Sequence, residues 1–462
     1  MVKKSKPRPR VFFFGIDGAS PDLIFKKWRK ELPTMSRLMS RGVYMETRSS
    51  IPPISIAAWS SIFSGKDPSE LGIFGYSHKG GYITSNQVRE KRIWEILSEQ
   101  KKNSVVLYVP LTFPAKRLNG VMVTDFLTPG INSNCTYPQI IKNRIKKMDN
   151  PELFFDVALG LAGHKGMKPG DLVKKTYKMT HMQLGLANQL LTEEDWDFFA
   201  VVMLGSDRLQ HMLWNHFDEK HPRYIKNSPY KNAVKNYYKY LDKELGKMVY
   251  KLPPGTPIIV ASDHGMVRQL GKININNWLI DKGFLVLKPE YKQTAGNKKI
   301  WFSKKIVDMN KSLAYASGAY HARIFINKKL AGKKYGKIIQ EIRRKLSAIR
   351  DPKGRKLATK IFNKDDIYQN PHNPECPDLT VYFDNLQWAS NPDLGSRGLY
   401  SWESAAGADS AGHSDTGMAI ISGNEIKKRG RLGKSDIRQI APTILKLLRN
   451  KIPSDIKAQP LI

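Results

Sequence analysis

Short apolar runs recur along this chain, and several of them lead directly into an aspartate or a histidine. Between the runs lie stretches with the spacing of amphipathic helices, such as Ile93–Glu99 and Tyr230–Tyr250. This alternation predicts an α/β fold in which a mostly parallel central sheet is flanked by helices. The strands that we expect are Val11–Ile16, Ser104–Val109, Phe198–Leu204, Pro257–Ser262 and Met418–Ser422.

The composition is that of a globular protein with an unusual charge. With 462 residues, of which 41% are hydrophobic, the chain can bury a large core as one domain or as a domain with an insertion. A net charge of +35 attracts phosphate-bearing substrates, nucleic acid or anionic lipid. The lysines are spread along the whole chain, which favours a generally basic surface over a dedicated polyanion partner. Binding to nucleic acid or to an anionic membrane is therefore possible but not predicted, and the oligomeric state stays open.

The N-terminus resembles a signal peptide only in its charge. The apolar run after Arg10 stops at Asp17, which is too short for the hydrophobic region of a signal peptide. We therefore expect a basic tail over residues 1–10, followed by one catalytic domain over residues 11–462. No segment has the roughly 18 uninterrupted apolar residues of a membrane span. Cys135 and Cys376 form no disulfide pattern, so we expect a reduced, cytoplasmic protein.

The character of the sequence changes between residues 283 and 402. Lysine-rich loops there surround expected strands at Ala322–Asn327 and Leu379–Phe383 and an expected helix at Tyr335–Ile349. This pattern predicts a cap or accessory lobe inserted into the main domain. We expect the last helix, Ser435–Leu448, to pack back on the main sheet.

Carboxylates and imidazoles stand at the ends of the expected strands. Asp17 follows the first strand, and Asp207 and His211 are four residues apart, so that on a helix they face one way. Asp263-His264 is the most specific pair, because burying two polar groups without partners costs several kcal/mol. Alone, Asp17 also fits a turn, and the Asp207 and His211 pair also fits an exposed surface. In α/β sheets, ligands bind beyond the carboxyl ends of the strands, so one crevice could hold all of these side chains.

Ser55 and His413 extend this set of residues. Ser55 lies where a proline-rich turn leads into a helix, and its hydroxyl is either a helix cap or a nucleophile. His413 precedes the last core strand, with Asp409 and Asp415 as supporting or surface carboxylates. Oxygen and nitrogen donors of these kinds bind zinc, manganese or iron. Metal-assisted phosphoryl transfer is therefore the leading hypothesis.

The motifs, in this order, resemble the alkaline phosphatase superfamily and, within it, the type I phosphodiesterase/nucleotide pyrophosphatase family. The resemblance covers most of the chain and implies an alkaline-phosphatase-like sandwich with an inserted cap. The motifs that carry it are Gly-Ile-Asp17-Gly, Pro-Pro-x-Ser55, Asp207-x-x-x-His211, Ser-Asp263-His264-Gly, His413 and Ile440-Ala-Pro-Thr-Ile-Leu445.

The resemblance implies a two-metal site around a serine nucleophile. The implied ligands are Asp17, Ser55, Asp263 and His264 for one ion, and Asp207, His211 and His413 for the other. The Ser55 oxygen would attack phosphorus in a phosphate-ester small molecule, and water would hydrolyse the phospho-serine or nucleotidyl-serine intermediate. The implied cofactors are two divalent ions, with zinc first and manganese or iron as alternatives.

One segment departs from the family pattern and keeps alternatives open. Where nucleotide pyrophosphatases tend to have His-Gly-Ile and then an asparagine that contacts phosphate, this chain has Leu71–Tyr76. Either Tyr76 donates its hydroxyl to the phosphate instead, or the substrate differs. The alternatives are a phosphomonoesterase, a phosphonate hydrolase or a phosphoglycerate-mutase-like enzyme of the same superfamily, and a non-catalytic polyanion-binding protein. Four cap side chains could stack on a base, although core packing is favoured: Tyr315, Tyr320, His321 and Trp388.

Overall fold

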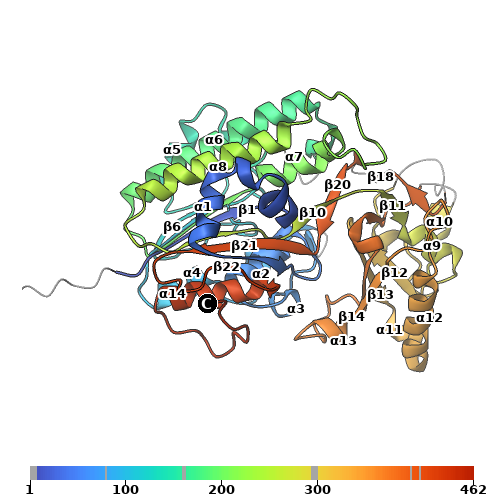
Figure 1. The fold of residues 1–462 in the computed structure, drawn as a ribbon. Coiled ribbons are helices and arrows are strands. Elements are labelled where there is room, and N and C mark those ends of the chain that lie inside the picture. The colour runs from blue at the N-terminus through green and yellow to red at the C-terminus, as the bar shows by residue number, and fades with distance from the viewer. Residues whose placement is uncertain (1–7, 79–80, 159–162, 293–299, 396–397, 405–406) are drawn as a thin grey trace, which may run out of the picture. The chain divides into compact units, whose positions relative to one another are not determined.

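The computed structural model describes residues 8–462 except 79–80, 159–162, 293–299, 396–397 and 405–406 (Figure 1). Most of the predicted basic tail therefore lies outside the described residues. The chain divides into two compact units. Unit 1 comprises Met1–Leu213, Asn227–Met266 and Asp415–Ile462, and unit 2 comprises Trp214–Lys226 and Val267–Ser414. The predicted cap, 283–402, falls within unit 2, which extends beyond both of its ends. No described helix has both the length and the apolar character needed to cross a bilayer.

Unit 1 is built on one large sheet. Its described strands follow the order β22-β2-β21-β9-β1-β8-β5-β6-β7, with β23 also paired to β2. The strands β9, β1, β8, β5 and β6 run parallel, and the antiparallel strands lie toward the edges. This arrangement confirms the predicted α/β fold class. The strand bounds are β1 Val11–Ile16, β2 Gly42–Arg48, β5 Ser104–Leu107, β6 Gly120–Val123, β7 Thr136–Tyr137, β8 Phe198–Met203, β9 Ile258–Ala261, β21 Thr416–Ser422, β22 Gly430–Arg431 and β23 Ser435–Asp436.

Helices cover both faces of this sheet. Figure 1 shows α1, α6 and α8 on one side and α2, α4 and α14 on the other. The central strands are buried along their whole length, because side chains from both helix layers pack on them. The helix bounds in unit 1 are α1 Pro33–Arg41, α2 Ser55–Ser64, α3 Pro68–Leu71, α4 Ile93–Glu99, α5 Ile140–Lys146, α6 Pro169–Glu193, α7 Gly205–Leu213, α8 Ala233–Lys251 and α14 Ile440–Leu447, with a short hairpin of β3 Ser77–His78 and β4 Gly81–Tyr82.

The last helix begins later than predicted. Ser435 and Asp436 form β23 beside β2, and a 3₁₀ turn at Ile437–Gln439 leads into α14. The Asp436 side chain accepts the Arg438 N–H, and the Gln439 side chain accepts the Asp436 N–H. This reciprocal capping starts the helical turn at Ile437, so the Ser435-Asp436 pair stays extended.

Unit 2 has its own core around an antiparallel sheet of order β12-β13-β15-β14 and a smaller sheet of order β16-β11-β17. Tyr315 lies in this core between the rings of Phe302 and Phe325, and Trp388 packs on Tyr400. Core packing therefore explains Tyr315 and Trp388. The elements are β11 Gly271–Asn274, β12 Ala314–Ser317, β13 Ala322–Ile326, β14 Lys360–Asn363, β15 Leu379–Tyr382, β16 Trp388–Asn391, β17 Tyr400–Ser401, β18 Glu403–Ser404, β19 Gly407–Ala408, β20 Ala411–Ser414, α9 Ile275–Asp281, α10 Pro289–Lys292, α11 Lys328–Ala331, α12 Tyr335–Ser347 and α13 Lys364–Ile367, and β10 Gly265–Arg268 spans the boundary of the two units.

Candidate metal centre

Three buried donors meet at the carboxyl ends of β1 and β9. Because these strands are parallel neighbours, Asp17 after β1 and Asp263-His264 after β9 emerge at the same edge of the sheet. Donor atoms of Asp17, Asp263 and His264 lie within 4.8 Å of one another, and all three residues are fully buried. His264 Nε2 is 3.1 Å from Asp263 Oδ2 and 3.7 Å from Asp17 Oδ1. We call these three residues the first ligand set.

The charges in the first ligand set call for a cation. Burial raises the pKa of both Asp17 and Asp263 well above the usual range, and the negative charges of neighbouring aspartates, Asp207 included, raise it further. Asp263 Oδ2 receives no hydrogen bond from the described residues. Buried carboxylates of like charge are costly without a counter-charge, and a divalent cation supplies one. The donor set therefore fits a metal ion.

Ser55 is the first residue of α2, and its hydroxyl is directed at the first ligand set. The N-cap of α2 is Ile54, and no side chain caps this helix. Ser55 Oγ instead donates to Asp17 Oδ1 at 3.3 Å and lies 3.4 Å from His264 Nε2. The Ser55 side chain therefore does not act as a helix cap.

Trp59, one turn further along α2, fixes the orientation of Asp17. Its indole Nε1 donates to Asp17 Oδ2 at 2.8 Å, and this bond lowers the pKa of Asp17 against the effect of burial. Gly15 on β1 makes room for the ring, since a Cβ there would lie 2.6 Å from Trp59 Cη2. In the sequence, Gly15 lies next to the Asp17 motif and Trp59 next to the Ser55 motif, but no sequence pattern indicates that Gly15 and Trp59 pack together.

Replacing Trp59 by phenylalanine is expected to weaken metal binding about tenfold, because groups that orient a ligand typically contribute that much. Without the indole donor, the pKa of Asp17 rises and protons compete better for the carboxylate. Metal titration by calorimetry at neutral pH measures the change. Trp94→Phe is the matched control, because Trp94 is equally buried and its Nε1 has no hydrogen-bond partner among the described residues. Equal affinities in the two variants would refute the role of Trp59.

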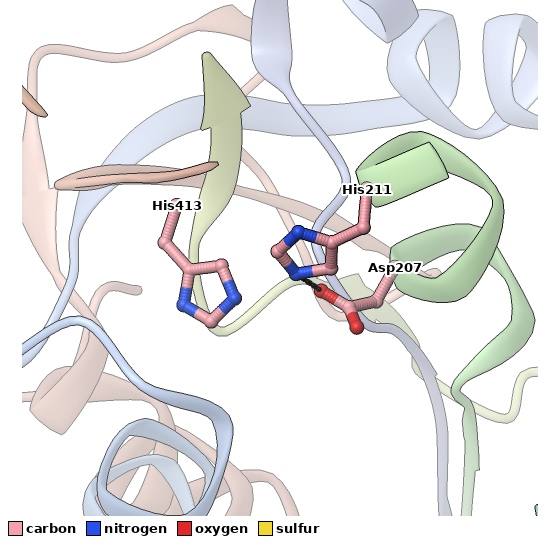
Figure 2. Close-up of side chains that lie close together, drawn as sticks. All are labelled: Asp207, His211 and His413. Carbon is pink, nitrogen blue, oxygen red and sulfur yellow. Dashed lines mark ion pairs between the residues drawn. The ribbon is translucent and has the colours of Figure 1, made fainter. Parts of the chain in front are cut away.

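Asp207 and His211 form a second buried pair at the start of α7, which follows the parallel strand β8. As the four-residue spacing predicts, both side chains face one way, with His211 Nε2 3.2 Å from Asp207 Oδ1 (Figure 2). Ser206 holds this helix start against β1 by donating to the Asp17 carbonyl oxygen at 2.6 Å. Figure 2 also draws His413, the residue that the resemblance adds to this pair.

His413 lies on β20 in unit 2, two residues before Asp415 returns the chain to unit 1. Within unit 2, the Tyr320 ring stacks on its imidazole with the ring centroids 4.3 Å apart. Asp409, a competing carboxylate in the sequence, is bound in a buried ion pair to Lys272 at 3.1 Å. Asp409 therefore has a structural partner of its own.

Arg208 and Asp156 are residues of this region that the sequence interpretation missed. The Arg208 guanidinium binds both carboxylate oxygens of Asp156, at 3.1 and 2.7 Å, and donates to Asp207 Oδ2 at 3.2 Å. The charge of Asp156 raises the pKa of Arg208 despite burial, so the guanidinium stays charged. Arg208 directly follows Asp207 in the sequence, and this position could have indicated a role at the site. Asp156 lies far from Arg208 in the sequence, so no local pattern connects the two.

Tyr76 lies close to Ser55, Asp17 and Asp207. Burial and the charges of Asp17 and Asp207 raise the pKa of Tyr76, while the charge of Arg208 and a hydrogen bond with Ser55 act in the opposite direction. The phenol therefore keeps its proton at neutral pH and can donate a hydrogen bond.

Known proteins resemble this chain in family and in fold. Residues 11–408 match the family model of type I phosphodiesterase / nucleotide pyrophosphatase. Human ectonucleotide pyrophosphatase / phosphodiesterase 5 has a similar solved structure, with 13% identity, 96% of each chain covered and a TM-score of 0.56. The murine protein, as an inactive variant in complex with AMP, gives 12% identity, the same coverage and a TM-score of 0.55. No curated protein matches the chain.

The fold and the family model together define the class of this protein. The architecture is that of the alkaline phosphatase superfamily, as the sequence predicts. The chain belongs to the type I phosphodiesterase / nucleotide pyrophosphatase family and is a phosphodiesterase-type hydrolase.

Proposed function

We propose that this protein cleaves phosphodiester or pyrophosphate bonds of nucleotides or similar molecules through a covalent intermediate on Ser55. The observation that carries the proposal is the position of Ser55 Oγ, 3.3 Å from Asp17 Oδ1 and 3.4 Å from His264 Nε2. A hydroxyl at a helix start that caps nothing and faces buried donors has the surroundings of a nucleophile.

Two divalent ions complete the proposed site, with zinc first and manganese or iron as alternatives. The proposed ligands are Asp17, Ser55, Asp263 and His264 for one ion, and Asp207, His211 and His413 for the other. When bound, the ions lower the pKa of the serine hydroxyl and neutralise charge on the phosphate oxygens.

The chain's own groups then carry out two displacements at phosphorus. In the first, a bond forms between Ser55 Oγ and phosphorus, the bond to the leaving oxygen breaks, and the hydroxyl proton passes through solvent to the leaving oxygen. In the second, a water oxygen bonds to phosphorus, the bond to Oγ breaks, and Ser55 regains a proton. The N-terminal backbone N–H groups of α2 are placed beside Ser55 to bind phosphate oxygens.

Tyr76 and Arg208 are the proposed contacts for the substrate phosphate. A guanidinium has five N–H hydrogens, and the bonds to Asp156 and Asp207 use three of those of Arg208. The remaining hydrogens can bind a phosphate oxygen, while Asp156 keeps the guanidinium plane in place. Tyr76 takes the place of the asparagine found in related enzymes.

Replacing Arg208 by glutamine is expected to raise the KM for a phosphate ester about tenfold or more, with a smaller fall in kcat, because a charge-assisted contact to the bound substrate is lost. Steady-state kinetics measures this split, and Arg208→Lys should recover part of the loss. Arg144→Gln is the control, since Arg144 forms an ion pair with Glu193 on the surface. Loss of bound metal in Arg208→Gln would show instead that Arg208 only positions Asp207.

The proposed activity is tested with a nitrophenyl phosphodiester and the matching monoester, using metal-reconstituted protein. Faster cleavage of the diester, with competition by AMP, which the murine relative binds, supports the proposal. Preference for the monoester would favour a phosphomonoesterase or a mutase-like enzyme. No hydrolysis and no retained metal would favour a polyanion-binding protein.

The absence of a disulfide pattern in the sequence supports a cytoplasmic location as part of the same proposal.

A further inference from the structure

Helix α8 carries a regular row of lysines that the proposed hydrolase site does not use. They occur at every fourth position, and we call them the lysine stripe: Lys235, Lys239, Lys243, Lys247 and Lys251. On an α-helix, a step of four residues advances about 6 Å along the axis and keeps successive side chains adjacent. Each step also turns about 40° around the axis, so the stripe is a row of evenly spaced positive charges that winds across the solvent-facing half of α8.

The lysine stripe borders a groove of about 1810 Å³ in unit 1, lined by α1, α8 and the second half of α6. The groove takes in all of the stripe except Lys235, as well as Arg37 and Arg41 of α1. None of the proposed ligands, nor Ser55, Tyr76 or Arg208, lines it. The groove is thus a feature separate from the metal centre.

The wall between α1 and α8 is fixed by close packing. Asp242 of α8 accepts the backbone N–H groups of Thr34 and Met35 at 2.9 and 2.8 Å, which caps the start of α1. A Cβ at position 246 would lie 2.7 Å from Thr34 Oγ1, so Gly246 permits this close approach. The cations of the two helices therefore stand on a rigid frame.

The acidic residues of the groove compensate only part of its positive charge, and Lys251 donates a hydrogen bond to Asn188 Oδ1 at 2.9 Å. Glu31 lies 3.5 and 3.7 Å from two lysines of the stripe, and Glu244 pairs with a third at 2.7 Å. Among the described residues, Arg37, Arg41 and Lys243 form no ion pair, and all three are exposed. Tyr250, which also lines the groove, is 91% exposed. An aromatic ring so placed is available for stacking.

We propose that this groove binds single-stranded nucleic acid. Cations along a groove suit a flexible chain of phosphates, which can follow the turn of the stripe around α8, whereas the broad surface of a membrane cannot enter a groove. Evenly spaced lysines can contact successive phosphates, and the exposed ring of Tyr250 can stack on a base. The groove then explains why part of the large positive charge is organised in a row on one helix.

The test measures binding of a fluorescent oligothymidylate of about 20 nucleotides, longer than one typical binding site. All proteins carry Ser55→Ala, so that hydrolysis does not interfere. The groove variant is Arg41→Glu, Lys243→Glu and Lys251→Glu. The control variant, Lys329→Glu, Lys333→Glu and Lys337→Glu, changes the net charge equally at exposed positions of unit 2. Circular dichroism and thermal melting check that each variant is folded.

We expect the groove variant to weaken binding at least about tenfold and to reduce the slope of log K against log salt by about two, as loss of three phosphate contacts predicts. The control variant should change the affinity by less than about threefold. Tyr250→Ala should weaken binding severalfold without changing the salt slope. These results do not depend on the hydrolase activity, so a failure of one proposal leaves the other standing.

Equal weakening in both charge variants would overturn the proposal, because the binding would then follow net charge alone. Tighter binding to a DNA duplex, or to vesicles with about one fifth phosphatidylserine, lost in the groove variant, would assign the surface to that partner instead.

Discussion

Ser55→Ala should lower kcat/KM for a phosphodiester by at least about a thousandfold, because it removes the oxygen that we propose attacks phosphorus. The fold should be unaffected. Alanine is a good helix former, and the Ser55 hydroxyl does not cap α2. Hydrolysis of a nitrophenyl diester measures the loss. Acid quenching of the wild-type reaction, followed by mass spectrometry, should show a phosphate-containing adduct on the peptide with Ser55 and none in the variant.

Ser60→Ala is the matched control for this experiment. Ser60 is a buried serine on the same helix, and its hydroxyl has no hydrogen-bond partner among the described residues. We expect the control to keep wild-type activity. If Ser55→Ala retained more than about a tenth of the activity, attack by water without a covalent step would replace the proposed mechanism.

Asp263→Asn should abolish tight metal binding and lower kcat/KM by about a thousandfold, yet make the metal-free protein more stable. The pKa of Asp263 is raised in the folded protein, chiefly by burial. As the pH rises from the ordinary aspartate range through this raised pKa, the unfolded chain loses its proton first, and folding stability falls. Asparagine removes this cost, and its side-chain oxygen can still accept the Gly18 N–H that Asp263 Oδ1 accepts at 3.2 Å.

Thermal melting of the metal-free wild-type protein and the variant, from about pH 5 to about pH 8, tests this prediction. We expect the variant to melt at a higher temperature at the upper end and the two curves to approach each other at the lower end. Added zinc should raise the melting temperature of the wild-type protein and not of the variant. If the metal-free variant were less stable than the wild type at every pH, the buried Asp263 carboxylate would not destabilise the metal-free protein.

The sequence predicted most of the elements around the first ligand set. The bounds of β1 and α4 are those expected. Strand β8 is one residue shorter than expected at its end, and β9 is one residue shorter at each end. These elements are local patterns of apolar residues, so a single chain segment contains the information. The predicted start of the last helix was wrong because Ser435 and Asp436 pair with β2 as strand β23, and the capping by Asp436 and Gln439 begins the helical turn only at Ile437.

The order of residues along the chain already shows which donors exist and, through the resemblance, to which family they point. How those donors are used depends on the folded chain. It directed the Ser55 hydroxyl to Asp17 rather than to the backbone of its own helix, and it brought Asp156 to Arg208. It also placed the lysine stripe of α8 beside a groove. The reason is physical, because each of these contacts joins segments that are far apart in the chain, and only the packing of complete helices on a complete sheet brings them together.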